Sequence, residues 1–176
     1  MNLNIKLILI TSLIILTICK KPVEDSDALS LNFDEEYECY TYPIKIGSKG
    51  QKFEVQIDTT TSETWIPSIN ATIKGNKFNI TTSKSGLLTN KTFELEDEDG
   101  NVRGKSVYDK VKVGSYNLDK LGFVLVDEFE VGFKDYPQGK LGLGYKQEHG
   151  NDFNFIGLLK EKKLINKKTI YFSARN

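Results

Sequence analysis

One segment constrains the fold more than any other part of the chain. Residues 53–68 read Phe-Glu-Val-Gln-Ile-Asp-Thr-Thr-Thr-Ser-Glu-Thr-Trp-Ile-Pro-Ser, and apolar side chains alternate at Phe53, Val55 and Ile57. This period of two predicts a half-buried β-strand. The strand ends at Asp58, where a buried carboxylate is costly unless the hydroxyls and N–H groups that follow hydrogen-bond it. Asp58 is therefore either a structural turn acid or a carboxylate held for catalysis.

The N-terminus is typical of a targeting segment. A largely apolar run at residues 7–18 follows a basic residue. Such a run is too short to span a bilayer but fits the core of a signal peptide. We expect cleavage after Cys19, so that residues 1–19 are a signal peptide; a retained anchor or a lipid-modified Cys19 is the alternative. Residues 20–39 then form a short acidic leader, and residues 40–176 form the folded lobe.

Three sequons agree with passage through the secretory pathway. They begin at Asn70, Asn79 and Asn90, and each has the Asn-x-Ser/Thr pattern of an N-glycosylation acceptor. If they are used, residues 70–92 lie on the surface. The sequence therefore predicts a glycoprotein that is secreted or resides in an endomembrane, lysosome-like compartment, with no membrane attachment after signal cleavage.

Composition and cysteine content exclude several classes of protein. The chain has 24 basic and 24 acidic residues, so it lacks the basic footprint of a nucleic-acid binder. Removal of Cys19 leaves Cys39 as the only cysteine. No internal disulfide can then form, and Cys39 is either a buried free thiol or half of an intermolecular bridge. The single histidine, His149, and the two cysteines suggest no metal site, and we expect no cofactor.

The rest of the chain is rich in β-strand patterns. Alternation at Tyr40, Tyr42, Ile44 and Ile46 indicates one strand, and the dipeptide Asp99-Gly100 is a strong hairpin signal. Ile156, Leu159 and Leu164 lie at near-helical spacing and predict a short amphipathic helix over residues 156–164. The expected strands cover residues 40–46, 53–58, 93–99, 100–113, 121–126 and 169–172.

Several of these segments resemble, in order, the N-terminal lobe of a pepsin-like aspartic protease. Residues 42–48 resemble its first hairpin arm, residues 53–68 its Asp-Thr-Gly-Ser/Thr strand followed by Trp and Pro, and residues 93–114 its flap. Residues 139–145, Gly-Lys-Leu-Gly-Leu-Gly-Tyr, resemble its glycine-rich segment, and residues 164–175 resemble the end of the lobe. The resemblance implies a mostly β, single acid-protease β-barrel lobe with a short C-terminal helix and a closing strand.

The resemblance also implies roles for individual residues. Pepsin-like enzymes hold two aspartates together, one from each lobe, and the pair shares one proton. Asp58 matches the catalytic aspartate of the N-terminal lobe, Thr59 and Thr61 match the supporting positions of its motif, and Trp65 matches the tryptophan that supports the flap. Thr60 stands where the motif has Gly, and its stiff β-branched side chain puts the local geometry in question.

The hairpin expected to form the flap departs from the family. Asp97 occupies the position of the flap Tyr, and Asp99 and Gly100 form the turn. Five acids stand in this hairpin: Glu94, Glu96, Asp97, Glu98 and Asp99. They are either a solvated hairpin without a role or a border of the cleft that disfavours ionisation of Asp58.

Three functional hypotheses follow. The first is an aspartic-type endopeptidase, degenerate or inactive as a lone lobe, which acts on peptides or proteins when a second copy or a second lobe supplies the missing aspartate. The second is a secreted, non-catalytic lobe that binds peptides or a partner. The third is a truncated fragment of a two-lobe protease. In all three, the glycines at 139, 142 and 144 are packing residues, and the apolar edge at residues 169–172 invites pairing with another chain.

Overall fold

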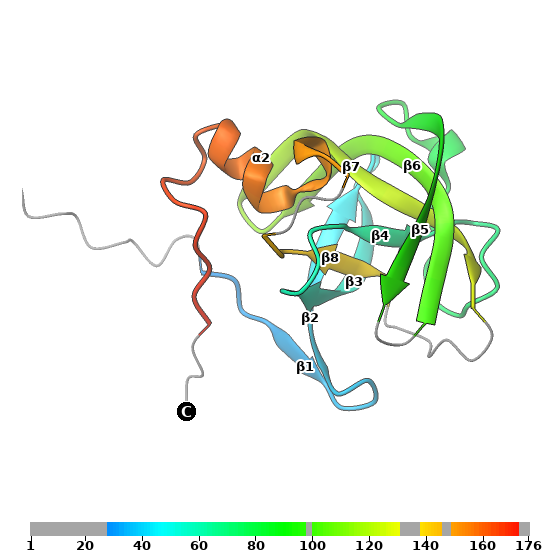
Figure 1. Cartoon of the computed structure of the whole chain (residues 1–176), viewed down its shortest axis with the longest axis horizontal. Helices are drawn as coiled ribbons and strands as arrows, with labels where there is room; N and C mark the ends of the chain where they lie inside the picture. Colours follow the sequence, from blue (N-terminus) through cyan, green and yellow to red (C-terminus); the bar gives the residue numbers. More distant parts are fainter. Residues whose placement is uncertain (1–27, 98–99, 131–137, 146–148, 173–176) are drawn as a thin grey trace, which may run out of the picture.

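The structure, a computed structural model, describes residues 28–97, 100–130, 138–145 and 149–172, and it is built mainly of β-strands (Figure 1). These segments hold one mixed sheet and a short C-terminal helix, which confirms the predicted mostly β lobe. The strands are β1 (Asn32–Asp34), β2 (Cys39–Ile46), β3 (Gln51–Asp58), β4 (Trp65–Pro67), β5 (Leu87–Asp97), β6 (Gly100–Val113), β7 (Tyr116–Phe129) and β8 (Lys140–Gly142). The helical elements are the 3-10 turns η2 (Ile80–Thr82) and η3 (Asn151–Phe153) and the α-helix α2 (Phe155–Glu161).

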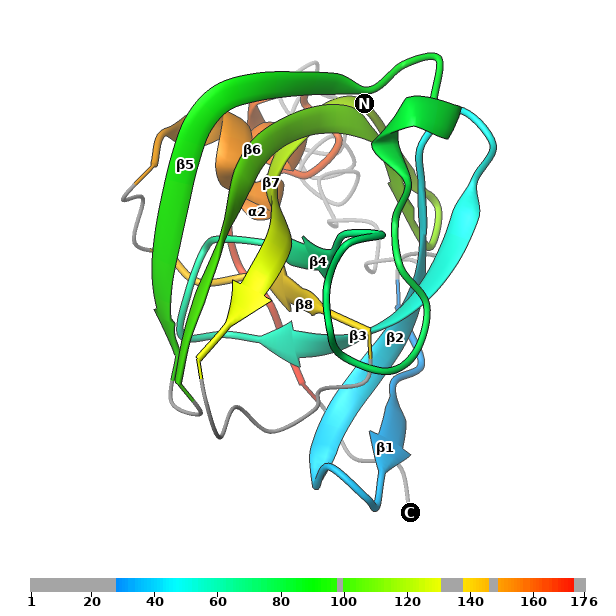
Figure 2. The same cartoon turned by 90° about the vertical axis from the view of Figure 1, so that its right-hand side faces the viewer.

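The sheet curls round and closes on itself. Its strand order is β1-β2-β3-β8-β4-β7-β6-β5, and β2 also pairs with β6, with Ile44 opposite Val113 and Ile46 opposite Val111. The strands from β2 round to β6 therefore form a closed barrel, with β1 and β5 attached outside the ring. Figure 2 shows the long strands β5, β6 and β7 arching over the short strands β4 and β8.

The alternation in the sequence explains how β2 and β3 face the core. Phe53 and Val55 of β3 are buried, as predicted. Tyr42 of β2 packs against the same core as Ile44 and Ile46, whereas Tyr40 is 57% exposed and instead contacts the ring of Phe33 in β1. The barrel interior is filled by the apolar side chains of the strands and α2, which gives the site at the end of β3 a rigid base.

The predicted amphipathic helix is present but ends earlier than residue 164. The Asn154 side chain caps α2 by accepting a hydrogen bond from the Gly157 N–H. At the other end Lys163 adopts a positive φ of 58°, and the Leu164 N–H returns to the Leu159 carbonyl. This is the bonding pattern of a Schellman motif. Leu164 therefore leaves the helix and is 45% exposed.

The prediction of a closing strand at residues 169–172 is wrong. This segment has no regular secondary structure, and in Figure 1 it runs along the outside of the barrel, below α2. Its β-branched and aromatic residues favour a strand, but a strand forms only when a neighbouring edge satisfies its backbone groups. Tyr171 is 89% exposed and Phe172 is 59% exposed, so the apolar surface expected at this end of the chain is present.

The region before the barrel contributes one strand. β1 lies inside the segment predicted to be a leader and pairs antiparallel with the start of β2, with Asp34 opposite Cys39. Residues 1–27 lie outside the described residues, so the signal peptide and its cleavage after Cys19 remain predictions. Among the described residues, no helix is long and apolar enough to cross a membrane.

Candidate active site

Asp58 is the last residue of β3 and is fixed by the strand beside it. β3 runs parallel to β8, with Asp58 opposite Gly142. The Leu143 N–H donates to the Asp58 carbonyl at 2.7 Å, and the Gly144 N–H donates to the Thr61 carbonyl at 2.6 Å. The hydroxyl-rich loop after Asp58 is therefore fastened at two points to the glycine-rich segment.

Glycine is required at two positions of the glycine-rich segment, Gly142 and Gly144. A Cβ on Gly142 would lie 2.5 Å from the Ser62 carbonyl carbon and from the Glu63 carbonyl oxygen, and a Cβ on Gly144 would lie 2.6 Å from the Thr61 carbonyl. These contacts are with backbone atoms and cannot be relieved by turning a side chain. The prediction that these glycines serve packing is confirmed, and their purpose is to let two backbones meet beneath Asp58.

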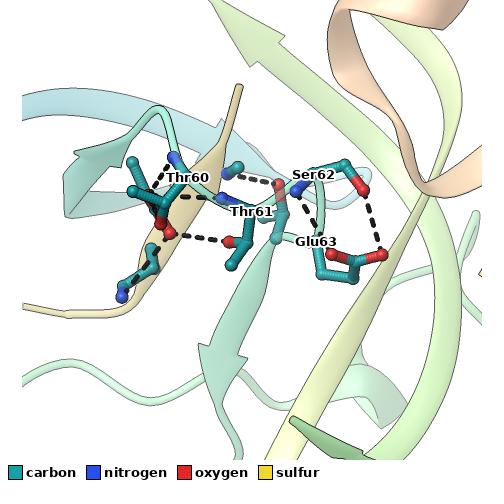
Figure 3. A network of polar contacts seen from close by, with 8 residues as sticks. Thr60, Thr61, Ser62 and Glu63 are labelled. Carbon is teal, nitrogen blue, oxygen red and sulfur yellow. Dashed lines mark hydrogen bonds and ion pairs between the residues drawn. The ribbon is translucent and has the colours of Figure 1, made fainter. Parts of the chain in front are cut away.

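The Asp58 carboxylate is surrounded by donors from Thr60 and Thr61, the two threonines labelled in Figure 3. Its Oδ1 accepts from the Thr60 N–H at 2.7 Å, from the Thr60 hydroxyl at 2.6 Å and from the Thr61 N–H at 3.4 Å. Its Oδ2 accepts from the Thr61 hydroxyl at 2.6 Å. Asp58 is only 6% exposed, so these donors replace the water that an exposed carboxylate would bind.

A buried lysine completes the surroundings of this carboxylate. Lys140, the first residue of β8, places its Nζ 3.6 Å from Asp58 Oδ2, and its side chain is 7% exposed. The sequence analysis did not select Lys140. A signal was present, because a lone basic residue in a short, glycine-flanked apolar segment must find a partner if that segment is buried.

These contacts decide the ionisation of Asp58. Burial by itself would raise its pKa, but the hydrogen bonds from Thr60 and Thr61 and the charge of Lys140 outweigh burial and lower the pKa below its ordinary value. Whether the acidic hairpin also acts on Asp58 remains a prediction, because Glu98 and Asp99 lie outside the described residues. Donors in direct contact have a stronger effect on the carboxylate than more distant acids.

The residue that replaces the motif's glycine fits its place. Thr60 is exposed, so its branched side chain points away from the packed backbone while its hydroxyl returns to Asp58. Thr61 supports the carboxylate as the resemblance implied. The hydrogen bonds to Asp58 come from these two threonines rather than from Thr59, which is exposed and lines a pocket beside the loop.

A second polar cluster follows directly in the same loop (Figure 3). Glu63 is buried, and its carboxylate accepts from the Ser62 N–H at 3.2 Å and from the Ser62 hydroxyl at 2.9 Å. His149 Nδ1 lies 3.0 Å from Glu63 Oε1. In a catalytic triad the serine hydroxyl bonds to the histidine, but here the Ser62 hydroxyl bonds to the Glu63 carboxylate. The three side chains therefore do not have the Ser–His–Asp order of a triad.

This cluster connects the Asp58 loop to the β5–β6 hairpin. The His149 ring packs edge-on against Phe93 of β5, with ring centroids 4.5 Å apart. Trp65 is buried in the same apolar cluster as Phe93 and Val102, one from each arm of the hairpin. Trp65 thus packs against the hairpin, and its role as the support of a flap remains a prediction.

The tip of the hairpin is only partly described. Asp97 ends β5 and pairs with Gly100 at the start of β6, and Gly100 has a φ of 125°. Asp99 lies outside the described residues, as does Glu98. Gly100 therefore belongs to a strand rather than to the turn in which it was expected, and the roles of Asp97, Asp99 and Gly100 in a flap remain predictions.

A hollow near the site is lined by the loop after Asp58 and not by Asp58 itself. A pocket of about 240 Å³ is bounded by Thr59, by Leu143 to Tyr145, and by Ile170 and Phe172 of the tail. Asp58 is not among its lining residues. The pocket therefore belongs to the apolar surface at the end of the chain.

The three sequons occupy different environments. Asn70 and Asn90 are exposed. Asn79 is half-buried and caps η2, with its Oδ1 accepting from the Thr81 N–H at 3.1 Å and from the Thr81 hydroxyl at 2.7 Å. Their glycosylation remains a prediction.

Comparison with known proteins agrees with this site. The family described as eukaryotic aspartyl protease matches residues 39–175. The chain is similar to an acid protease of Saccharomycopsis fibuligera, 30% identical over 81% of this chain and 38% of the relative, and to pregnancy-associated glycoprotein 1 of Sus scrofa, 36% identical over 60% and 29%. It is also similar to secreted aspartic protease 3 of Candida albicans, 28% identical over 77% of this chain and 37% of the relative.

The match is confined to part of each relative. The chain spans less than half the length of these proteins. Within that part, the strand that ends in Asp58, the glycine-rich segment beside it and the hairpin over Trp65 occur together in one barrel. The chain belongs to the eukaryotic aspartyl protease family.

Proposed function

We propose that this chain supplies one half of an aspartic endopeptidase active site. The observation that carries the proposal is the Asp58 carboxylate, which is buried at a strand end, held by donors on both oxygens and kept ionised. A carboxylate prepared in this way can act as the general base that activates a water for attack on a peptide carbonyl. The substrate class is a peptide or protein.

The second half of the chemistry comes from outside this barrel. Peptide hydrolysis by this route also needs an acid that protonates the substrate carbonyl, and in aspartic proteases a second carboxyl group serves. The described contacts of Asp58 are hydroxyls, N–H groups and one ammonium. A second copy of this chain or a second lobe would supply the acid, and the lone barrel would be inactive.

The partner surface in this proposal lies at the end of the chain. Tyr145, Ile170, Tyr171 and Phe172 are at least 36% exposed, and three of them border the pocket beside Thr59. An apolar surface of this kind next to the Asp58 loop favours association close to the carboxylate. The association would place a partner's acid near the site.

Sedimentation and a cleavage assay together test the proposed function. We expect concentration-dependent association and cleavage of an unfolded protein substrate at pH 3–5 that Asp58→Asn abolishes. Asp119→Asn is the matched control, since Asp119 is an exposed acid paired with Lys110 on the barrel surface, and it should leave cleavage intact. A chain that associates but never cleaves, or cleavage that survives Asp58→Asn, would contradict the proposal.

A non-catalytic peptide-binding lobe is the alternative, and Lys140 is the observation that favours it. An ammonium 3.6 Å from Asp58 can hold the carboxylate as a structural ion pair. In that case an extended peptide would bind with the same affinity to the wild type and to Asp58→Asn. Isothermal calorimetry on the two proteins distinguishes this reading from the catalytic one, in which Asp58 contacts the reacting group.

Secretion completes the proposal. A relative with the printed name secreted aspartic protease 3 supports an extracellular role. We assign residues 1–19 to a removed signal peptide and Asn70, Asn79 and Asn90 to N-glycosylation. N-terminal sequencing of the secreted chain, and its mass before and after glycosidase treatment, test both assignments.

A further inference from the structure

We propose that Lys140 is a positioning residue of this site, which pairs with Asp58 and assigns to it the role of base. The ion pair stands on the geometry alone, whereas its consequence for catalysis rests on the function proposed above. In a pair of carboxylates the proton is shared, and either member can carry it. An ammonium beside one member removes that equivalence when the other carboxyl belongs to a second lobe, because a second copy of this chain would carry its own Lys140 beside its own Asp58.

The strand register explains how Lys140 reaches the carboxylate. In the parallel pair of β3 and β8, Lys140 lies opposite Gln56, and Gly142 lies opposite Asp58. Because side chains two apart lie on the same face of a strand, Lys140 and Asp58 share one face of the sheet. Gly142 carries no side chain, so the long stem of Lys140 can extend along the strand to Asp58.

Burial favours a contact between this lysine and a carboxylate. The side chains of Lys140 and Asp58 are 7% and 6% exposed, and an ammonium at that depth is costly unless it is paired. The residues that follow it, Leu141 to Gly144, are apolar or glycine. Lys140 is thus a basic residue at a position where its neighbours in the sequence would favour an aliphatic side chain.

The other ionisable groups near this pair have different partners. Glu63 bonds to Ser62 and His149. Burial and the charge of Asp34 raise the pKa of the Cys39 thiol, and the charge of Lys140 opposes this rise in part. Thr60 and Thr61 contact Asp58 without carrying charge. The charge that faces Asp58 among the described side chains is therefore the ammonium of Lys140.

The chemical consequence is a fixed division of roles. Asp58 begins as a carboxylate and takes a proton from the water whose oxygen bonds to the peptide carbonyl carbon. The carboxyl group supplied by the second lobe begins protonated and gives its proton to the carbonyl oxygen. This step forms a neutral gem-diol, leaves Asp58 protonated and leaves the carboxyl group of the second lobe ionised, so atoms and charge balance.

Titration of the Asp58 carboxyl by carbon-detected NMR, without substrate, tests the ion pair. We expect Lys140→Met to move the Asp58 midpoint to higher pH and Lys140→Arg to return it close to the wild-type value. Lys52→Met is the matched control, because Lys52 is an exposed lysine on the same strand as Asp58, about 20 Å from it at the rise of a strand. The Asp58 midpoint in Lys52→Met should equal that of the wild type.

An unchanged Asp58 midpoint in folded Lys140→Met would overturn the proposal. If Lys140→Met does not fold, thermal unfolding of Asp58→Asn, and of Asp58→Asn combined with Lys140→Met, decides instead. We expect the double variant to fold and to melt at a higher temperature than Asp58→Asn, because methionine removes a buried ammonium that no longer faces a carboxylate at position 58. A double variant that melts at the same or a lower temperature would refute the pair.

The pH profile separates this inference from the proposed function. In an active assembly, Lys140→Met should shift the acid limb of kcat/KM to higher pH, because the base is then protonated more easily, and Lys140→Arg should restore the limb. An unshifted limb would contradict the role as base. A chain that never cleaves peptides, yet shows the NMR shift in Lys140→Met, would refute the proposed function and leave the ion pair established.

Discussion

The hydroxyl of Thr61 offers a direct measure of how the carboxylate is held. We expect Thr61→Val, which keeps the shape of the side chain, to lower the free energy of unfolding by about 2 kcal/mol at pH 7. The hydroxyl donates to Asp58 Oδ2 at 2.6 Å, and hydrogen bonds to charged groups contribute about 1.5–3 kcal/mol. Thr61 is half-buried, so water replaces the lost donor only in part.

Thr60→Val is the matched control for this prediction. The Thr60 hydroxyl makes a bond of the same length to Oδ1, but Thr60 is exposed and its N–H remains bonded to the same oxygen. Water can replace this hydroxyl, so the cost should stay below about 1 kcal/mol, the typical net contribution of one hydrogen bond.

Urea unfolding followed by the fluorescence of Trp65 provides the assay, since Trp65 is the only tryptophan and is 1% exposed. In an Asp58→Asn background the cost of Thr61→Val should fall to about 1 kcal/mol or less, because a neutral acceptor binds a hydroxyl less strongly. The reasoning is refuted if Thr61→Val costs less than Thr60→Val, or if its cost is unchanged in that background.

Three further predictions follow from the same structure. Gly142→Ala should lower the free energy of unfolding by about 3 kcal/mol, the upper end for overpacking, because the new Cβ would lie 2.5 Å from the backbone of Ser62. A loss below about 1 kcal/mol in urea unfolding would show that the glycine-rich segment and the loop after Asp58 can move apart. The pKa of Asp58 is lowered in the fold, so the stability that its carboxylate contributes is present above the unfolded pKa of about 3.9 and is lost as pH falls through the folded pKa. The free energy of unfolding of the wild type should therefore exceed that of Asp58→Asn by less below pH 3.9 than at pH 7. A difference that does not change with pH would contradict the direction of the pKa shift. Burial raises the pKa of the Cys39 thiol, so a thiol reagent at pH 8 should react with it much more slowly in the native protein than in 6 M urea, and equal rates would mean that the thiol is accessible.

Local patterns were sufficient to predict the longer strands and the position of the carboxylate, but not the short strands β1, β4 and β8. The alternation at Phe53 and Val55 reports directly which side of β3 is buried, because side chains on a strand change face at each residue. Asp58 could be selected for the same reason, since an acid that ends such a strand needs donors close in sequence, and Thr60 and Thr61 provide them.

Contacts between distant segments could not be read in this way. The pairing of Lys140 with Asp58 joins residues 82 positions apart, and it depends on the register of β8 against β3. His149 lay in a segment of polar residues that gave no sign of its contacts with Glu63 and Phe93. The closing strand at residues 169–172 was predicted from β propensity, which carries no information about whether an edge is available.

The sequence by itself determined the family, the longer barrel strands and the candidate carboxylate Asp58, because apolar alternation and a short motif with its own hydrogen-bond donors are local properties. Only the tertiary structure decided the ionisation state of Asp58. The pKa of Asp58 depends on the sum of burial, threonine donors and the Lys140 ammonium, and that sum exists only after β3 and β8 lie side by side. The tertiary structure also decided that the tail stays outside the sheet, since the formation of a strand depends on a partner as well as on its own residues.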